Sequence, residues 1–191
     1  MKRTMRTGLF VVLAALAACK REAEAEPAVA IPVVDEVSAQ ATPEPRSSVD
    51  ATAEYPTFKL PALDGSTYDL AAHRGKWVVV NFWATWCAPC LKEMPDLDAL
   101  DKARDDIDVV GLAYDEIEAA DMRAFLKEHP VSYPIVIVDV FAPPADFATP
   151  RGLPMTHLIA PDGKALKPFL GPVTAQEIEE AIAAHGKEGK A

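Results

Sequence analysis

The sequence is poor in cysteine, histidine and basic residues. It contains three cysteines and four histidines among 191 residues. A structural zinc site needs four ligands, and the chain offers neither a second cysteine pair nor a close histidine pair to complete one. Its 19 basic residues are outnumbered by 29 acidic ones, which gives a formal net charge of −10. This charge argues against binding to nucleic acid or to anionic lipid headgroups.

The chain also lacks an apolar run long enough to span a bilayer comfortably. The longest run, Leu9 to Ala18, has about ten residues, whereas a transmembrane helix needs about 20. It follows the basic residues Lys2, Arg3 and Arg6 and leads directly into Cys19. A basic start followed by a short apolar stretch is typical of a secretory signal.

The segment Leu16-Ala17-Ala18-Cys19 resembles the lipobox of bacterial lipoproteins. The resemblance implies that residues 1–18 are a signal peptide and that Cys19 is lipidated as the mature N-terminus. An ordinary cleaved signal and a retained anchor are the alternatives. Lys20, rather than Asp, follows Cys19, which favours the outer over the inner membrane. Residues 1–18 carry three basic residues and no acidic one, so their removal would change the net charge from −10 to −13.

Residues 20–53 are rich in Ala, Glu, Pro and Ser and contain no aromatic residue. Such a composition cannot bury a core, so residues 19–53 are expected to form a lipidated, flexible tether. A flexible chain of this length typically spans about 30–35 Å. Residues 54–186 remain for one globular domain, followed by a short tail at 187–191.

The most informative feature is the segment Cys87-Ala88-Pro89-Cys90, which lies between an apolar run, Val78–Val80, and an amphipathic helical pattern. A cysteine at a helix N-terminus has its thiolate stabilised by unpaired N–H groups and by the helix dipole, which lowers the thiol pKa. We therefore assign Cys87 as the exposed nucleophile. Cys90, three positions further on the same helical face, can reach Cys87 and resolve a mixed disulfide. A zinc ligand pair and two inert cysteines are the alternatives.

Residues Gly75 to Pro95, which include Trp86-Cys87-Ala88-Pro89-Cys90, closely resemble the TlpA/ResA-like branch of the thioredoxin superfamily. The resemblance covers roughly residues 54–186. Members of this branch are extracytoplasmic, membrane-tethered thiol–disulfide oxidoreductases. The resemblance implies an enzyme that needs no cofactor beyond its Cys87–Cys90 disulfide. It also implies an α/β thioredoxin fold, in which helices flank a central mixed β-sheet and a β-hairpin is added at the N-terminus.

The order of expected strands and helices, β-β-β-α-β-α-β-β-α, fits this fold. One hairpin is expected from residues 55–60 and 66–70, and another from 155–159 and 165–170. Buried strands are expected at 76–82 and 107–114, and a short apolar strand or extended segment at 135–138. Helices are expected at 88–104, 119–128 and from the cap Thr174 to about Gly186.

Pro154, in the segment Gly152-Leu153-Pro154-Met155-Thr156, lies just before an expected strand. In the resembled family a proline here is cis and faces the cysteine pair, excludes metal from the thiols, and exposes the backbone of Leu153 to a substrate strand. An ordinary turn proline is the alternative. Trp86 is expected to flank Cys87 and shelter it from water. Trp86, Leu153 and Pro154 are the expected substrate-binding residues, and no metal site is expected.

When Cys90 attacks, some group must accept and return a proton. Many cytoplasmic thioredoxins carry a buried Asp at the position matched here by Asn81, which cannot titrate. Glu93 lies one helical turn beyond Cys90, and in the resembled branch a Glu at this position is near the active site. A carboxylate shielded from water has a raised pKa and suits proton transfer near neutrality. The alternative is a solvated Glu that stabilises the helix start.

Four other residues carry weaker signals. Trp83 is interpreted as a packing residue. His157 stands where the family more often has an aromatic residue, and it is interpreted as a packing variant, with a metal or proton role as the alternative. Met122 and Met155 are expected in the core rather than as copper ligands.

The leading hypothesis is a lipid-anchored thiol–disulfide oxidoreductase on the periplasmic side of a bacterial membrane, whose reduced form attacks disulfides of exported proteins. The Ala88-Pro89 pair lacks the His of strongly oxidising relatives and resembles the reducing branch. That branch prepares apocytochrome c cysteines for haem attachment or copper-site cysteines for metallation. Electrons would come from a membrane thiol–disulfide donor, and the protein is expected to be a monomer.

Two other functions remain as alternatives. A thiol peroxidase of related fold has Thr three residues before a lone reactive cysteine, where this chain has Ala84 followed by two cysteines. A copper chaperone of similar fold needs a Cys-x-x-x-Cys spacing and a downstream His ligand, and the spacing between Cys87 and Cys90 is one residue shorter.

Overall fold

The computed structural model describes residues 49–188. The expectations for the signal peptide, for Cys19 and for the tether up to residue 48 lie outside this range. Within it, the strands and α-helices follow one another as β-β-β-α-β-α-β-β-β-α, which is the expected order with one strand more, because the segment Ile135–Val138 is a strand. No helix in residues 49–188 is both long enough and apolar enough to cross a membrane.

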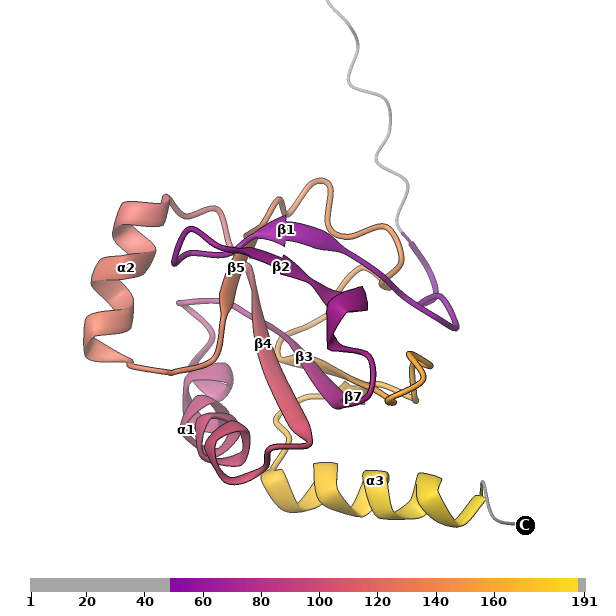
Figure 1. The fold of residues 1–191 in the computed structure, drawn as a ribbon. Coiled ribbons are helices and arrows are strands. Elements are labelled where there is room, and N and C mark those ends of the chain that lie inside the picture. The colour runs from indigo at the N-terminus through magenta and orange to yellow at the C-terminus, as the bar shows by residue number, and fades with distance from the viewer. Residues whose placement is uncertain (1–48, 189–191) are drawn as a thin grey trace, which may run out of the picture. The chain divides into compact units, whose positions relative to one another are not determined.

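A five-stranded mixed sheet with the order β5-β4-β3-β6-β7 is the centre of the fold (Figure 1). The strands of this sheet are β3 (Trp77–Trp83), β4 (Ile107–Tyr114), β5 (Ile135–Val138), β6 (Met155–Ile159) and β7 (Phe169–Leu170). The helices are α1 (Ala88–Ala103), α2 (Ala119–Glu128) and α3 (Ala175–Glu188). A separate two-stranded sheet consists of β1 (Lys59–Pro61) and β2 (Thr67–Asp69), and the 3-10 helix η1 (Leu70–His73) follows it.

Strand β3 is the central strand, and all seven of its residues are buried. It runs parallel to β4 and antiparallel to β6. Because side chains alternate along a strand, Val79 and Trp83 contribute to one face of the sheet, and Val80 and Phe82 contribute to the other. Strand β3 ends at Trp83, so the cysteine motif follows shortly after the carboxyl end of the central strand.

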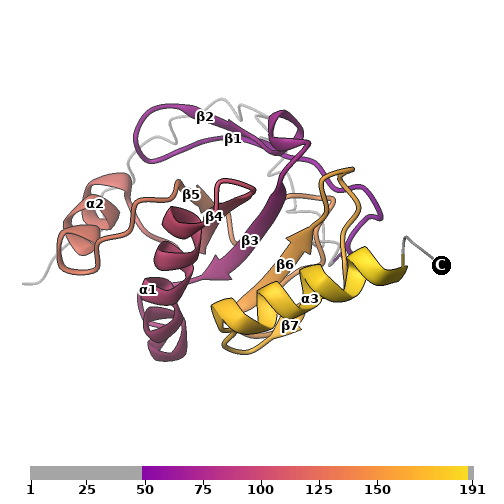
Figure 2. The same ribbon diagram turned by 60° about the horizontal axis from the view of Figure 1, so that its bottom comes forward.

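Helices α1 and α3 cover one face of the sheet (Figure 2). Met94 and Leu97 of α1 pack with Val79 and with Ile178 of α3 in this core. Helix α3 begins with a capping box, because Thr174 Oγ1 accepts the N–H of Glu177 (3.3 Å) and Glu177 accepts the N–H of Thr174 (2.8 Å). The expected cap at Thr174 is therefore confirmed.

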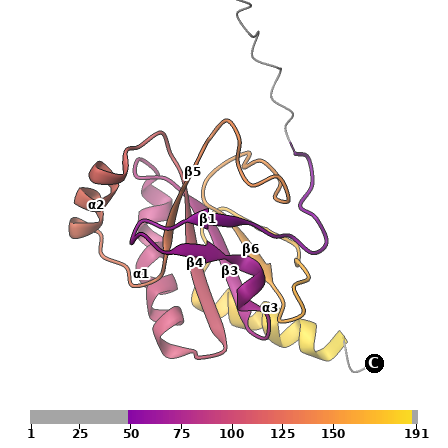
Figure 3. The ribbon, with the colours of Figure 1, turned by 45° about the horizontal axis from the view of Figure 1, so that its top comes forward.

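The hairpin β1–β2 covers the opposite face (Figure 3). Phe58 and Tyr68 stack at 5.6 Å between ring centroids and pack with Phe82 and Phe147. His157 lies fully buried within 5.1 Å of Phe147 and 5.9 Å of Phe82, measured between ring centroids. The interpretation of His157 as a packing residue agrees with these contacts.

Three expected strands are shorter than predicted, and the one expected at 55–60 is reduced to Lys59–Pro61. The strand expected at 165–170 is reduced to Phe169–Leu170, plus one bridge between Ile159 and Ala165. Pro168, which has no N–H to donate, stands between those two pieces. The strand expected to end at Leu70 stops at Asp69, because Asp69 accepts the N–H of Ala71 at 3.1 Å and starts η1.

The residues just before the hairpin are held against the loop that precedes β6. The backbone N–H of Ala53 donates to the carbonyl of Asp146 at 2.7 Å, and that of Thr149 donates to the carbonyl of Val49 at 2.9 Å. Thr52 Oγ1 accepts the N–H of Ala148 at 3.0 Å. Residues 49–53, assigned from composition to the flexible tether, thus pair with the domain, which begins earlier than expected.

Candidate redox site

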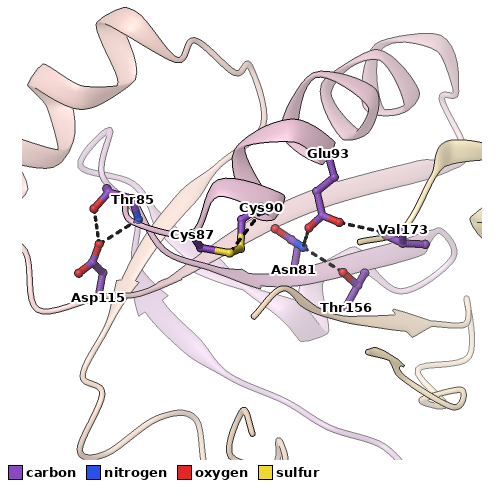
Figure 4. Close-up of a disulfide and its surroundings, with 8 residues drawn as sticks. All are labelled: Asn81, Thr85, Cys87, Cys90, Glu93, Asp115, Thr156 and Val173. Atoms are coloured by element: carbon purple, nitrogen blue, oxygen red, sulfur yellow. Dashed lines mark hydrogen bonds between the residues drawn. A yellow bond between two sulfur atoms is a disulfide. The ribbon is translucent and has the colours of Figure 1, made fainter. Parts of the chain in front are cut away.

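A disulfide between Cys87 and Cys90 lies at the start of helix α1 (Figure 4). Cys87 is the N-cap residue, and its Sγ accepts the backbone N–H of Cys90 at 3.3 Å. Pro89 occupies the first turn, where the absence of an N–H costs nothing. The sulfur of Cys87 therefore takes the place of a capping oxygen at the positive end of the helix dipole, which favours a thiolate there after reduction.

Cys87 is less accessible than the sequence predicts. Cys87 is 4% exposed and Cys90 is fully buried, so the expected exposed nucleophile is corrected to a buried one. The physical reason is their packing, since both belong to the core beneath α1 with Ala84 and Met94. The order of exposure still fits the predicted roles, because Cys87 is the outer of the two sulfurs.

The segment between β3 and the disulfide is fixed by a carboxylate at the end of β4. Asp115 Oδ2 accepts the backbone N–H of Thr85 at 3.0 Å and its hydroxyl at 2.6 Å. The sequence interpretation missed this pair. The pairing of the two strands is the signal that could have revealed it. Strands β3 and β4 are parallel and Trp83 pairs with Ala113, so Thr85 and Asp115 each lie two residues beyond that pair.

Glu93 is buried one turn beyond Cys90, so the alternative of a solvated first-turn Glu is wrong. Its Oε1 accepts Asn81 Nδ2 at 2.7 Å, and its Oε2 accepts the backbone N–H of Val173 at 2.8 Å. Burial raises the pKa of Glu93, while the hydrogen bonds from Val173 and Asn81 act to lower it, with burial dominant. A carboxyl group of this kind changes protonation closer to neutral pH than a solvated one.

Asn81 joins Glu93 to strand β6. Its Nδ2 also donates to Thr156 Oγ1 at 2.9 Å, and these two residues are paired across β3 and β6. Its Oδ1 is buried and has no hydrogen-bond partner within residues 49–188. The sequence identified Asn81 only as a position that cannot titrate. Thr156 and Val173, which complete the network, gave no signal from the sequence.

The peptide bond between Leu153 and Pro154 is cis, as the resemblance implies. Pro154 is buried at the start of β6, and its carbonyl accepts the N–H of Gly171 at 3.0 Å. Within residues 49–188, no group hydrogen-bonds to the backbone N–H or C=O of Leu153. This strand end therefore offers a free main-chain donor and acceptor.

Trp86 and Leu153 line the same groove, which has a volume of about 330 Å³. The other lining residues are Tyr114, Asp115, Glu116, Val140, Pro150, Arg151 and Gly152. Trp86 is 70% exposed, so most of its ring faces solvent. A second hollow of about 220 Å³ lies around Pro154 and includes Leu170, which is 75% exposed.

A disulfide at a helix N-terminus, a cis-proline strand end and a buried carboxyl group together define a thioredoxin-like redox domain. The family model described as Redoxin matches residues 50–182. The chain therefore belongs to the Redoxin family, and within it to the ResA-like thiol–disulfide oxidoreductases.

Individual relatives support this placement. The thiol-disulfide oxidoreductase ResA of one Bacillus cereus strain is 34% identical over 128 residues, which are 66% of this chain and 73% of that protein. ResA of Bacillus subtilis (strain 168) is 31% identical over 137 residues, 71% of this chain and 75% of that protein. The structure of a DsbF homologue from Corynebacterium diphtheriae matches with a TM-score of 0.59 at 25% identity, over 75% of this chain and 96% of that one.

Proposed function

We propose that this enzyme reduces disulfides of exported proteins through its Cys87–Cys90 pair. One observation carries the proposal. The outer cysteine caps helix α1, and its neighbour Trp86 shares a groove with Leu153, whose backbone N–H and C=O have no hydrogen-bond partner within residues 49–188. A client segment can therefore be held in extended form while its disulfide meets Cys87.

The reaction proceeds by two exchanges. The thiolate of reduced Cys87 attacks one sulfur of the client disulfide, forming a mixed disulfide and releasing one client thiolate. The thiolate of Cys90 then attacks Cys87 Sγ, forming the Cys87–Cys90 disulfide and releasing the second client thiolate. Two electrons pass from the enzyme to the client, and the two released thiolates take protons from solvent.

Glu93 is the proposed acceptor of the proton that leaves the Cys90 thiol before the second exchange. Its position one turn from Cys90, its burial and its raised pKa support this role. A general base works best when its pKa lies near the working pH. Glu93 returns the proton when the disulfide is reduced again.

Trp86, Leu153 and Pro154 are the proposed substrate contacts. The exposed indole of Trp86 provides apolar surface at low entropic cost. The free N–H and C=O of Leu153 can pair with the main chain of an extended client, as in strand addition to a sheet edge. Such contacts read the backbone and accept many client sequences.

The reducing direction rests on the Ala88-Pro89 pair, which resembles the reducing branch of the family. Suitable clients are apocytochrome c and proteins with copper-site cysteines, and a membrane thiol–disulfide protein would return the electrons. When the protein is equilibrated in graded thiol buffers, the Cys87–Cys90 pair is expected to show a reduction potential below about −220 mV. A potential near about −120 mV would reverse the assignment to that of a disulfide donor.

The proposed location is the periplasmic side of a bacterial membrane, and the outer membrane is favoured. In this proposal residues 1–18 are the signal peptide and Cys19 is the lipidated residue. The enzyme is proposed to act as a monomer. The lipobox-like segment before Cys19 supports this anchor. Cell fractionation tests it directly. The parent chain should sediment with membranes, and Cys19→Ser should appear in the soluble fraction. Sedimentation of Cys19→Ser with membranes would contradict lipidation as the anchor.

A further inference from the structure

Asn81 carries a polar atom of the buried site network that lacks a partner among residues 49–188. Its Oδ1 is buried without a hydrogen bond, whereas both hydrogens of its Nδ2 are used, by Glu93 and by Thr156. Figure 4 shows Asn81 between Cys90 and Glu93, with its oxygen turned toward the side on which Cys90 lies. An unpaired buried carbonyl is unfavourable, so its persistence calls for a physical reason.

The oxidation state of Cys90 supplies that reason. A sulfur in a disulfide has no hydrogen to donate, and the structure contains the Cys87–Cys90 disulfide. A reduced Cys90 thiol has an S–H donor. Because this oxygen is turned toward the side on which Cys90 lies, the S–H of a reduced Cys90 is a donor that Asn81 Oδ1 would accept and would lose when the disulfide forms.

The opposite end of the amide matches an ionised Glu93. Both carboxylate oxygens accept N–H groups, Oε1 from Asn81 at 2.7 Å and Oε2 from Val173 at 2.8 Å. A protonated Glu93 carries one O–H, which on Oε1 would face the Asn81 amino group and on Oε2 would face the Val173 N–H. Either position places two donors against each other. If the amide turns over, Oδ1 faces Glu93 and accepts that O–H.

We propose that Asn81 is a positioning residue whose side-chain amide turns over between two orientations and thereby couples the proton on Glu93 to the proton on Cys90. In the first orientation, Oδ1 accepts the Cys90 S–H and Nδ2 donates to the Glu93 carboxylate. In the second orientation, Nδ2 donates to the Cys90 thiolate and Oδ1 accepts the Glu93 O–H. The proposal rests on the proposed role of Glu93.

The two orientations differ in the position of one proton. Cys90 Sγ loses it and a Glu93 carboxylate oxygen gains it, and no electron moves in this step. The resulting thiolate then attacks Cys87 Sγ as described above. Thr156 suits both orientations, because its hydroxyl accepts from Nδ2 in the first and can donate to Oδ1 in the second.

The surroundings of Glu93 leave Cys90 as the partner for this coupling. Within residues 49–188, no charged side chain shifts the pKa of Glu93, whose causes are burial, Val173 and Asn81. Tyr133, in the loop before β5, is the other titratable group coupled to Glu93. Burial chiefly raises the pKa of Tyr133, with Asp98 and then Glu93 adding to the rise, so it stays neutral in the working range.

Carbon-13 NMR of the reduced protein, labelled at cysteine Cβ and glutamate Cδ, tests the coupling. In the parent protein, Cys90 and Glu93 should each titrate in two steps with shared midpoints, because strongly interacting groups titrate as a pair. In Asn81→Ala, each group should titrate in a single step of its own. The resolving exchange should also slow about tenfold or more at neutral pH, as expected when proton transfer is impaired.

Val79→Ala is the matched control, because Val79 lies on the same strand and the same face of the sheet but is an apolar core residue outside the network. It should lower stability and keep the two-step titration. Retention of shared midpoints in Asn81→Ala would overturn the inference. If Glu93→Gln changes the Cys90 titration while Asn81→Ala does not, the role of Glu93 stands and that of Asn81 fails. If Glu93→Gln also leaves Cys90 unchanged, the proposed role of Glu93 fails as well.

Discussion

Glu93 on helix α1 and Asn81 on strand β3 share a buried hydrogen bond of 2.7 Å between Oε1 and Nδ2. This bond ties the helix that carries the disulfide to the central strand of the sheet. It also keeps a titratable carboxyl group away from water, one turn from Cys90. The proposed proton acceptor is thus also the residue that links helix α1 to strand β3.

The raised pKa of Glu93 predicts a pH-dependent stability of the oxidised protein. In the window between the unfolded value of about 4.5 and the higher folded value, the folded state binds more protons than the unfolded state. The contribution of Glu93 to the free energy of unfolding should therefore fall as pH rises through this window. Glu93→Gln cannot titrate, so urea unfolding of this variant should lack that fall.

Glu93→Gln should also slow the resolving exchange, by about 10- to 100-fold near neutral pH, because general-base assistance is lost. The first exchange, carried out by Cys87, should keep its rate. Rapid-quench measurement of mixed-disulfide formation and decay separates the two steps. Equal slowing of both steps would indicate a general structural effect instead.

The two hydrogen bonds from Thr85 to Asp115 predict that Asp115 positions the loop before Cys87. Asp115→Ala should lower the free energy of unfolding by about 1–3 kcal/mol and slow reaction with a protein disulfide. Glu116→Ala is the control, because Glu116 lines the same groove and its replacement removes the same charge without affecting a contact to Thr85. Equal losses in the two variants would show that charge, rather than loop position, matters.

The buried His157 predicts a loss of stability in mild acid. Burial lowers the pKa of His157 from 6.5 to about 4. At this residue the unfolded state binds more protons between these values, so the contribution of His157 to the free energy of unfolding should drop as pH falls from about 6.5 to about 4, by on the order of 3 kcal/mol. In His157→Phe this part of the drop should vanish. Parallel curves for the parent and the variant from urea unfolding at several pH values would contradict this account.

Gly111 on β4 predicts a steric limit in the centre of the sheet. An added Cβ would lie 2.7 Å from Ile135 Cδ1 and 2.9 Å from Trp83 Nε1. Gly111→Ala should therefore destabilise the fold by about 1–3 kcal/mol through overpacking. Gly152→Ala, where a Cβ meets no atom within 4 Å, should change stability by less than about 0.5 kcal/mol. Thermal unfolding of both variants gives the comparison, and similar losses would argue against the steric explanation.

Much of this architecture could be predicted from local sequence signals. The apolar run in β3, the helix N-terminus at Cys87 and the Thr174 cap are encoded within a few residues, and the structure confirms each of them. The cis bond at Pro154 followed from the resemblance, and it is present too.

The partners of the buried carboxyl group could not be predicted in the same way. Val173 meets Glu93 across 80 residues of sequence, and Thr156 meets Asn81 across 75. Such contacts are set by tertiary packing, which hydrophobic periodicity and capping patterns do not encode. The pairing of residues 49–53 with the loop before β6 could not be predicted from composition. Composition indicates that the side chains of a segment cannot form a core, but it does not indicate which hydrogen bonds its backbone makes.

The most direct test of the account is trapping of the mixed disulfide. Cys90→Ser, reduced and mixed with a protein that contains a disulfide, should accumulate a covalent adduct through Cys87, because the resolving sulfur is absent. Cys87→Ser should form no such adduct under the same conditions, since Cys90 is fully buried. Mass spectrometry of the digested adduct identifies the linked cysteine. An adduct through Cys90, or no adduct with either variant, would contradict the assignment of Cys87 as nucleophile and Cys90 as resolving residue.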